Sequence, residues 1–288
     1  MILCAHINLL PAALLARRIC RGRLYLIVHG IDAWQPTRDP IANACVRKID
    51  DFISVSSITR RRFLQWSGLR QDQGVVLPNC VDLSAFTPGT KSPELLKRYG
   101  LEDRTIMLTV GRLASEERYK GFDELIKILP RLEKAIPNIA YLIVGEGRDR
   151  PRLEQKARDF GVADRVVFAG YVSEAEKADH YRLADVYVMP SSGEGFGIVI
   201  LEALACGIPV IGSKTDGSRD ALRNGKLGIV VNPTNLSEIE TAVLDVLQKR
   251  RRRNSRNGVS EDDTVDYFSK TRFEDRVHNL MGTLAGSK

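Results

Sequence analysis

EGFGIVILEALACG, residues 194–207, is apolar apart from two glutamates. Glu194 comes just before an expected helix start near Phe196, and Glu202 lies inside that helix. The segment follows DVYVMPSSG, which reads as a buried strand and its turn. A strand, a turn and a helix in this order are typical of a parallel α/β sheet. In such sheets ligands bind beyond the carboxyl ends of the strands, where this pattern places both glutamates.

The alternation of strands and helices continues on both sides of this segment. Continuous apolar strands joined by amphipathic segments indicate parallel sheets covered on both faces. The segment PNCVDLSAFTPGTKS (78–92) is rich in turn-forming residues and is expected to connect two such units. The expected strands are 24–28, 52–55 and 75–77 before it, after a first strand near the N-terminus, and 106–110, 140–144, 165–170, 185–190, 209–213 and 228–231 after it.

The predicted fold is therefore α/β, with two Rossmann-like domains of doubly wound parallel sheet. We expect the first at residues 1–89, the second at 102–258, and a C-terminal helix within 265–288 that packs back toward the first domain. The first unit offers about four strands against six in the second, without an opening Gly-rich strand-to-helix turn, so we expect it to be incomplete.

Composition excludes several classes of protein. The net charge is +7 and the pI about 9.2, but the run KRRRR (249–253) is expected near a helix end, where basic residues complement the helix dipole. Aromatic residues make up 7% of the sequence and do not alternate with basic residues, which argues against a nucleic-acid binder.

The cysteines and the N-terminal segment exclude further classes. Five cysteines without a C-x-x-C pair indicate neither a disulfide framework nor a zinc site. The apolar N-terminus lacks a positive n-region and is too short to span a bilayer, so we expect a strand and a helix with Pro11 in its first turn.

The 194–207 segment combines features of an anion site. Gly195 and Gly197 permit close approach to the backbone, and a helix start offers free N–H groups to phosphate. Eight helical residues rise about 12 Å, which would let each glutamate hold hydroxyls with a diphosphate between them. The alternative is an acid favoured by the helix dipole, with Glu202 on a solvated face.

Three further residues lie at expected strand ends or helix starts. Arg112 directly follows strand 106–110 and Lys120 opens the next helix, so the two cations could neutralise a diphosphate leaving group. The alternative is two surface cations in a basic protein. His29 ends strand 24–28 and could bind a sugar hydroxyl or transfer a proton, or it could be satisfied by local backbone.

Other catalytic motifs are absent from the sequence. VGEGRDR (144–150) lacks the last glycine of the dinucleotide fingerprint, because that place falls on Arg150. The sequence contains no P-loop, no G-x-S-x-G, no H-E-x-x-H and no D-x-D pair for a metal-bound nucleotide sugar. We therefore expect no metal site and no resident cofactor.

Several of these segments resemble glycosyltransferase family 4. They are VGRL…KGF, GEG, FAGYVS, the run from Ala184 to Ser213, and PNCVDLSAF. The resemblance covers nearly the whole chain and is most specific from Thr109 to Asn232. It implies a GT-B fold with two facing Rossmann-like domains, an N-terminal acceptor side and a C-terminal donor side. It also implies metal-independent transfer of a sugar from a nucleoside diphosphate to an acceptor hydroxyl, with retention at the anomeric carbon.

The resemblance also assigns roles to the candidate residues, position by position. Arg112 and Lys120 match the cations that hold the donor diphosphate, and His29 matches a histidine near the donor sugar and acceptor. Glu194 and Glu202 match the two glutamates of the E-x7-E motif, which bind the sugar and the ribose. The remaining donor contacts that it implies are Val172 near the base and the amides of Gly195, Phe196, Gly197 and Ile198.

The sequence departs from the family pattern at three places. Met1 falls inside a pattern that usually begins with a further strand and Gly-rich loop, which is a second reason to expect an incomplete first domain. Cys80 stands where glycine is usual, and Asp216 takes the first place of a usual Gly-Gly pair. Asp216 is expected to place a negative charge near a phosphate and to weaken donor binding.

Three functions remain open at this point. The first is a retaining transferase in polysaccharide or glycoconjugate biosynthesis, using a UDP- or GDP-linked sugar and a saccharide or lipid-linked acceptor. The second is a non-catalytic nucleotide-sugar binder. The third is a nucleotide-sugar epimerase, for which the first domain offers only aspartates that form no evident pair, at positions Asp32, Asp39, Asp50, Asp51, Asp72 and Asp82.

The expected location is the cytoplasm. The segment LLARRICRGR (14–23) and the basic run could also contact anionic lipid at the inner face of a membrane, although a solvated face explains both.

Overall fold

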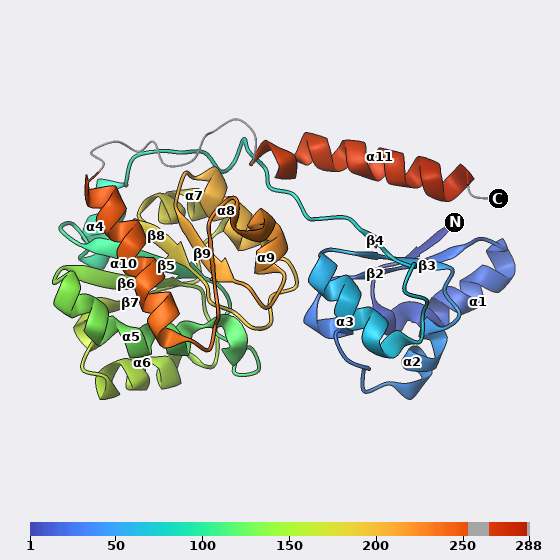
Figure 1. The fold of residues 1–288 in the computed structure, drawn as a ribbon, viewed down its shortest axis with the longest axis horizontal. Coiled ribbons are helices and arrows are strands. Elements are labelled where there is room, and N and C mark those ends of the chain that lie inside the picture. The colour runs from blue at the N-terminus through green and yellow to red at the C-terminus, as the bar shows by residue number, and fades with distance from the viewer. Residues whose placement is uncertain (253–264, 287–288) are drawn as a thin grey trace.

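The computed structural model describes residues 1–252 and 265–286, which form two lobes, each built on a parallel sheet (Figure 1). The first sheet has the strand order β1-β2-β3-β4. Its strands are β1 (Ile2–Cys4), β2 (Leu24–Val28), β3 (Asp51–Ser54) and β4 (Val75–Val76). The helices of this lobe are α1 (Leu10–Cys20), α2 (Pro40–Val46) and α3 (Ser57–Ser67), with the 3-10 turns η1 (Ile7–Leu9) and η2 (Ile31–Ala33).

The second sheet has six strands in the order β10-β9-β8-β5-β6-β7. They are β5 (Thr105–Val110), β6 (Ile139–Val144), β7 (Val166–Gly170), β8 (Val186–Val188), β9 (Val210–Ser213) and β10 (Ile229–Val231). The helices are α4 (Pro93–Tyr99), α5 (Phe122–Ala135), α6 (Arg150–Asp159), α7 (Glu174–Arg182), α8 (Ile198–Ala205), α9 (Ser218–Ala221) and α10 (Leu236–Arg252), with the 3-10 turns η3 (Arg118–Lys120), η4 (Ala163–Arg165) and η5 (Arg223–Gly225).

Strand β6 shows why the second lobe is doubly wound. All six of its residues are buried, and they alternate between two core clusters. Ala140, Leu142 and Val144 pack with residues of α4, α7 and α8, whereas Ile139, Tyr141 and Ile143 pack with residues of α5, α6 and α10. A strand with helices on both faces needs apolar residues at every position. The prediction of two parallel α/β domains is confirmed, and the second lobe is doubly wound.

Local signals set the helix starts of the first lobe. Asp39 caps α2 by accepting hydrogen bonds from the amides of Ile41 and Ala42, and Ser56 caps α3 through the amide of Thr59. Pro11 lies in the first turn of α1, as predicted. These caps fix the ends of the helices that pack on the first sheet.

The C-terminal helix α11 (Lys270–Gly286) follows the 3-10 turn η6 (Asp266–Phe268) and extends out over the first lobe (Figure 1). Its start is tied to the connection between the lobes, since the Val81 amide donates to the Phe268 carbonyl oxygen at 2.9 Å. Of the predicted run 249–253, α10 includes residues up to Arg252, while Arg253 and the polar segment 254–263 lie outside the described residues. Within the described ranges, no helix has the length and apolarity needed to cross a membrane.

Candidate functional site

Gly195 lies where the two lobes touch. A Cβ atom on Gly195 would lie 2.2 Å from the carbonyl oxygen of His29, and one on Gly30 would lie 2.7 Å from the Gly195 Cα. The Gly195 carbonyl oxygen also accepts hydrogen bonds from Ser56 Oγ at 2.7 Å and from Thr59 Oγ1 at 3.2 Å. The carboxyl end of β2 and the start of α3 are therefore held directly against the loop that follows β8.

The loop that carries Arg112 and Lys120 lies beside the same segment. Arg112 follows β5, which pairs with β8, and Lys120 ends η3. The Ser192 amide donates to the Tyr119 carbonyl oxygen at 2.9 Å, and a Cβ on Gly193 would lie 2.3 Å from the Tyr119 ring. These contacts place the two cations next to the residues that lead into Glu194.

Both cations contact one carboxylate that the sequence reasoning did not single out. Arg112 Nη2 donates to Glu117 Oε1, and Lys120 Nζ lies 3.3 Å from Glu117 Oε2. The Arg112 side chain is 76% exposed, whereas the side chains of Lys120 and Glu117 are 12% and 15% exposed. Glu117 lies between Arg112 and Lys120 in the sequence, but no sequence motif marks its role.

The backbone of Glu194 is held by the turn at Asp216. The Glu194 amide donates to Asp216 Oδ2 at 2.9 Å, and the Glu194 carbonyl oxygen accepts from the Gly217 amide at 2.8 Å. Asp216 is fully buried, and this burial raises the pKa of its carboxyl to about 6, although hydrogen bonds from Glu194, Ser218 and Ser191 lower it. Asp216 thus fixes the loop that leads into α8.

The start of α8 corrects one prediction. The helix begins at Ile198, two residues after the expected start near Phe196, because Gly197 adopts the left-handed conformation with φ of 96°. Residues 194–197 are not helical, so the rise of about 12 Å expected for eight helical residues is wrong as a measure of the distance between the two glutamates.

Glu202 lies in the second turn of α8 and is buried, with 5% of its surface exposed. Its carboxylate accepts hydrogen bonds from Tyr181 Oη at 2.6 Å and from Lys177 Nζ at 3.1 Å. The alternative of a glutamate on a solvated face is therefore wrong. Tyr181 and Lys177, both on α7, were not foreseen, because their contact with Glu202 joins positions more than 20 residues apart in the sequence.

The other predicted residues have different surroundings. His29 is exposed, with Nε2 at 2.9 Å from the Ala5 carbonyl oxygen. Val172 follows β7, the edge strand, and packs against the core cluster that includes Tyr181 and Leu201. The Phe196 ring is buried edge-on against Phe268, at 5.7 Å between centroids. The structure brings together Arg112, Lys120, Glu194, Gly195 and the His29 backbone.

The six aspartates of the first lobe serve local structure or lie apart. Asp50 accepts from Arg17 and the Leu24 amide, and Asp51 from the Phe52 and Gly74 amides. Asp39 caps α2, Asp72 pairs with Arg70, Asp82 accepts from Ser84, and Asp32 lies 3.9 Å from His6. Among the described residues, no three or more His, Cys, Asp or Glu side chains gather in a way that could hold a metal ion.

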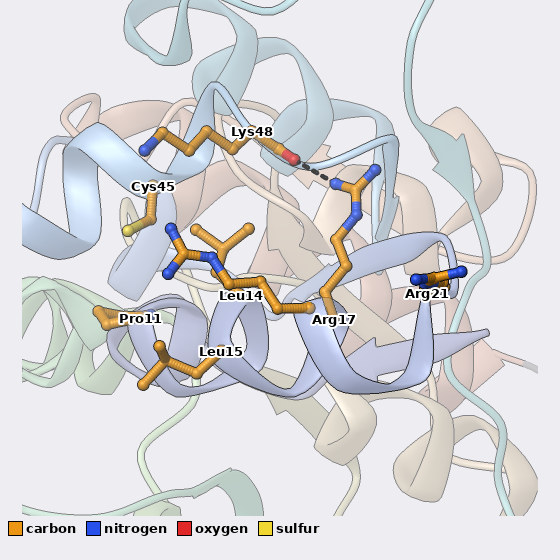
Figure 2. A pocket seen from close by; sticks show the side chains of 8 residues that line it. Pro11, Leu14, Leu15, Arg17, Arg21, Cys45 and Lys48 are labelled. Atoms are coloured by element: carbon orange, nitrogen blue, oxygen red, sulfur yellow. Dashed lines mark hydrogen bonds between the residues drawn. The ribbon is translucent and has the colours of Figure 1, made fainter.

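A pocket of about 610 Å³ lies elsewhere, between α1 and the end of α2 (Figure 2). Arg17 crosses it to donate to the Lys48 carbonyl oxygen at 2.8 Å. Its lining combines cations with aliphatic side chains: Pro11, Leu14, Leu15, Arg17, Arg18, Arg21, Cys45 and Lys48. None of these residues belongs to the Gly195 contact between the lobes, so the candidate site is the convergence of loops described above.

Comparisons with known proteins agree with this architecture. Residues 91–261 match the model of the family described as glycosyl transferases group 1. A GDP-mannose-dependent alpha-(1-6)-phosphatidylinositol monomannoside mannosyltransferase of Mycolicibacterium smegmatis is 37% identical over 258 residues, which cover 84% of this chain and 66% of that protein. The match thus spans just under two thirds of the relative's length. A D-inositol 3-phosphate glycosyltransferase of Geodermatophilus obscurus is 33% identical over 71% of this chain and 47% of its own length.

Solved structures show the same fold at lower identity. A sucrose-phosphate synthase from Thermosynechococcus elongatus aligns with a TM-score of 0.81 and 22% identity over 99% of this chain and 74% of its own. The Anabaena protein HepE, solved in complex with UDP, aligns with a TM-score of 0.78 and 20% identity over 98% of this chain and 79% of its own. The protein described here has the GT-B fold and belongs to the group 1 glycosyl transferases.

Proposed function

We propose that this protein is a retaining glycosyltransferase of family 4 that moves a sugar from a nucleoside diphosphate to an acceptor hydroxyl. The observation that supports this most is the meeting of three loops at Gly195. The carboxyl ends of β2, β5 and β8 come from both sheets, and they bring two cations and one glutamate to one place. Ligand sites of α/β folds lie at such strand ends.

Each residue would have a distinct task in this reaction. Arg112 and Lys120 would neutralise the diphosphate as negative charge grows on it in the transition state. The amides of residues 195–198 at the start of α8 would support the same phosphates. Glu194 would hold hydroxyls of the donor sugar, Glu202 the ribose, Val172 would lie near the base, and His29 would lie near the sugar and the acceptor.

Retention would follow if the acceptor hydroxyl attacks the face from which the diphosphate leaves. Such an attack requires no covalent nucleophile from the protein, and the departing diphosphate can accept the proton of the acceptor. Arg112 and Lys120 would serve this route by stabilising the leaving group.

We further propose a GDP-linked mannose as the donor, on the strength of the 37% identical relative whose name specifies GDP-mannose. The products would enter polysaccharide or glycoconjugate biosynthesis. UDP-linked sugars are the competing donors.

The deciding experiment is sugar transfer and thermal unfolding of the purified chain with GDP, UDP and ADP and their sugars, beside Arg112→Ala. A ligand at about 100 times its dissociation constant stabilises a protein by about 2.7 kcal/mol. We expect this for GDP, and we expect Arg112→Ala to lower turnover by roughly 100-fold or more, since one lost transition-state contact costs ~3 kcal/mol.

Arg118→Ala is the matched control, because Arg118 lies in the same loop but pairs with Asp149 at 3.5 Å. Near-normal transfer by Arg112→Ala would contradict the assignment. Nucleotide binding without transfer or donor hydrolysis would instead identify a non-catalytic binder. Interconversion of the donor sugar would indicate an epimerase, although the aspartates of the first lobe offer no pair for it.

A further inference from the structure

Two cations, Arg112 and Lys120, share one internal anion, the carboxylate of Glu117. Glu117 contacts Arg112 through Oε1 and lies 3.3 Å from Lys120 Nζ through Oε2. Oε2 is buried, and it makes no hydrogen bond to any described group. A carboxylate between two cations presents a negatively charged oxygen atom to each of them, as a phosphate group would.

The backbone of the loop positions Glu117 and Lys120 for this contact. Glu117 immediately precedes η3, and the Lys120 amide donates to the Glu117 carbonyl oxygen at 3.2 Å. The Lys120 side chain runs back along Gly111, where a Cβ would lie 3.4 Å from Lys120 Cδ. Arg118, the third cation of the loop, points instead to Asp149. Of the three cations in this loop, Arg112 and Lys120 therefore contact Glu117, and Arg118 does not.

The charges of the site do not favour a diphosphate while Glu117 stays in place. The positive charges of Arg112 and Lys120 are offset by the carboxylates of Glu117 and Glu194. Both carboxylates lie near Tyr119, whose pKa is raised to about 12 by burial first and then by Glu117 and Glu194. A diphosphate that bound beside Glu117 would meet a like charge at short range in a partly desolvated place, which is costly.

We propose that Glu117 occupies the diphosphate position as an internal anion, which orders Arg112 and Lys120 until the donor diphosphate displaces it. This inference builds on the proposed function and adds to it a residue that sets the strength of donor binding. Its consequence is that the free energy of donor binding includes the loss of two ion pairs, so removing the charge of Glu117 should tighten binding. A residue that only orients the cations would have the opposite effect.

The test is isothermal titration calorimetry with GDP and with inorganic pyrophosphate on the wild-type chain, Glu117→Gln and the control Glu116→Gln. Glu116 is an exposed neighbour, so its substitution makes the same change in net charge without touching the cations. We expect both probes to bind Glu117→Gln about tenfold more tightly, which corresponds to ~1.4 kcal/mol. Glu116→Gln should change either affinity by less than about twofold.

A double variant makes the test specific. In a Lys120→Ala background, Glu117→Gln should tighten binding much less, because part of the competition is gone. Equal or weaker binding by Glu117→Gln in the wild-type background would overturn the inference. If Glu117→Gln fails to fold, Glu117→Asp replaces it. The shorter aspartate side chain would lie farther from both cations, so we expect it to tighten binding by roughly threefold. Unchanged or weaker binding by Glu117→Asp would equally overturn the inference.

Failure of the proposed function has a different outcome. In that case the wild-type chain would bind none of GDP, UDP, ADP and pyrophosphate. Both the proposed function and the Glu117 inference would then be wrong. Binding by the wild type without a gain in Glu117→Gln would overturn the inference alone and leave the transferase proposal standing.

Discussion

The two lobes of this protein differ in how their sheets are covered. The second lobe has six strands, with helices that bury apolar residues of the central strands on both faces. The first lobe has four strands and one core cluster, and much of its apolar surface near the N-terminus is exposed. Leu15 is 60% exposed and Ile19 85%, on α1.

The difference bears on how the candidate site is built. Both cations and both glutamates belong to the second lobe, where the sheet is covered on both faces. The first lobe contributes the contacts at Gly30, Ser56 and Thr59, which hold the Gly195 loop from outside. We infer that nucleotide binding depends mainly on the second lobe, while the first lobe restrains the loop at its edge.

The largest effect is expected from truncating a buried leucine in the core of either lobe. Leu26 on β2 and Leu108 on β5 are both fully buried on interior strands of their sheets. Truncation of either to alanine should lower the free energy of unfolding by about 2–5 kcal/mol. Urea unfolding followed by circular dichroism, with and without GDP, would measure this.

The comparison is sharpened by the response to nucleotide. We expect Leu26→Ala to keep most of the stabilisation by GDP, because the cations lie in the other lobe, and Leu108→Ala to lose more of it. Loss of the GDP effect in Leu26→Ala alone would show that the first lobe controls the site.

A second effect concerns Asp216 in the second lobe. Its pKa is raised by burial from 3.8 to about 6, so the folded state binds a proton more tightly than the unfolded state. The stabilisation from this proton is fully present below pH ~3.8 and is lost as the pH rises through about 6. Its size is about 3 kcal/mol, from about two pKa units at 1.36 kcal/mol each.

Asp216→Asn should remove this dependence. Because other carboxylates titrate in the same range, the measurement is the difference between the unfolding free energies of wild type and variant from pH 4 to 8. We expect the difference to shift in favour of the variant as the pH rises. A flat difference for Asp216→Asn would contradict the burial argument.

The smallest effect tests the contact between the lobes. Ser56 accepts from the Thr59 amide as the cap of α3 and also donates to the Gly195 carbonyl oxygen. Ser56→Ala should cost about 1–2 kcal/mol of stability, from the lost cap and the lost buried hydrogen bond. Chemical denaturation would measure it.

Ser92→Ala is the matched control for this substitution. Ser92 caps α4 in the second lobe by accepting from the Leu95 amide, without a bond between the lobes. A larger loss for Ser56→Ala than for Ser92→Ala would measure the contact with Gly195. Equal losses would show that this contact adds nothing to stability.

The strands of the second lobe could be predicted to within about two residues, because each is a short apolar run bounded by turn-forming residues. The start of α8 was placed too early, since an apolar run with glycines does not reveal which glycine adopts the left-handed conformation. Expected strand ends and helix starts identified the segments that hold Arg112, Lys120 and Glu194. Glu117, Ser56 and Thr59 were missed, because no sequence pattern marks a serine or threonine at a helix start, or a glutamate in a loop, as part of a contact between distant segments.

Local chemistry along the chain, namely apolar runs, turn-forming residues and capping residues, was enough to determine the parallel α/β architecture and the strand ends where the site lies. Those features act over a few residues, so they can be read in order. Folding decided which carboxylate meets the two cations, which groups hold Glu202, and that Gly195 accepts hydrogen bonds from the other lobe. These contacts join residues from 3 to 139 positions apart, and the packing of loops and lobes brings them together.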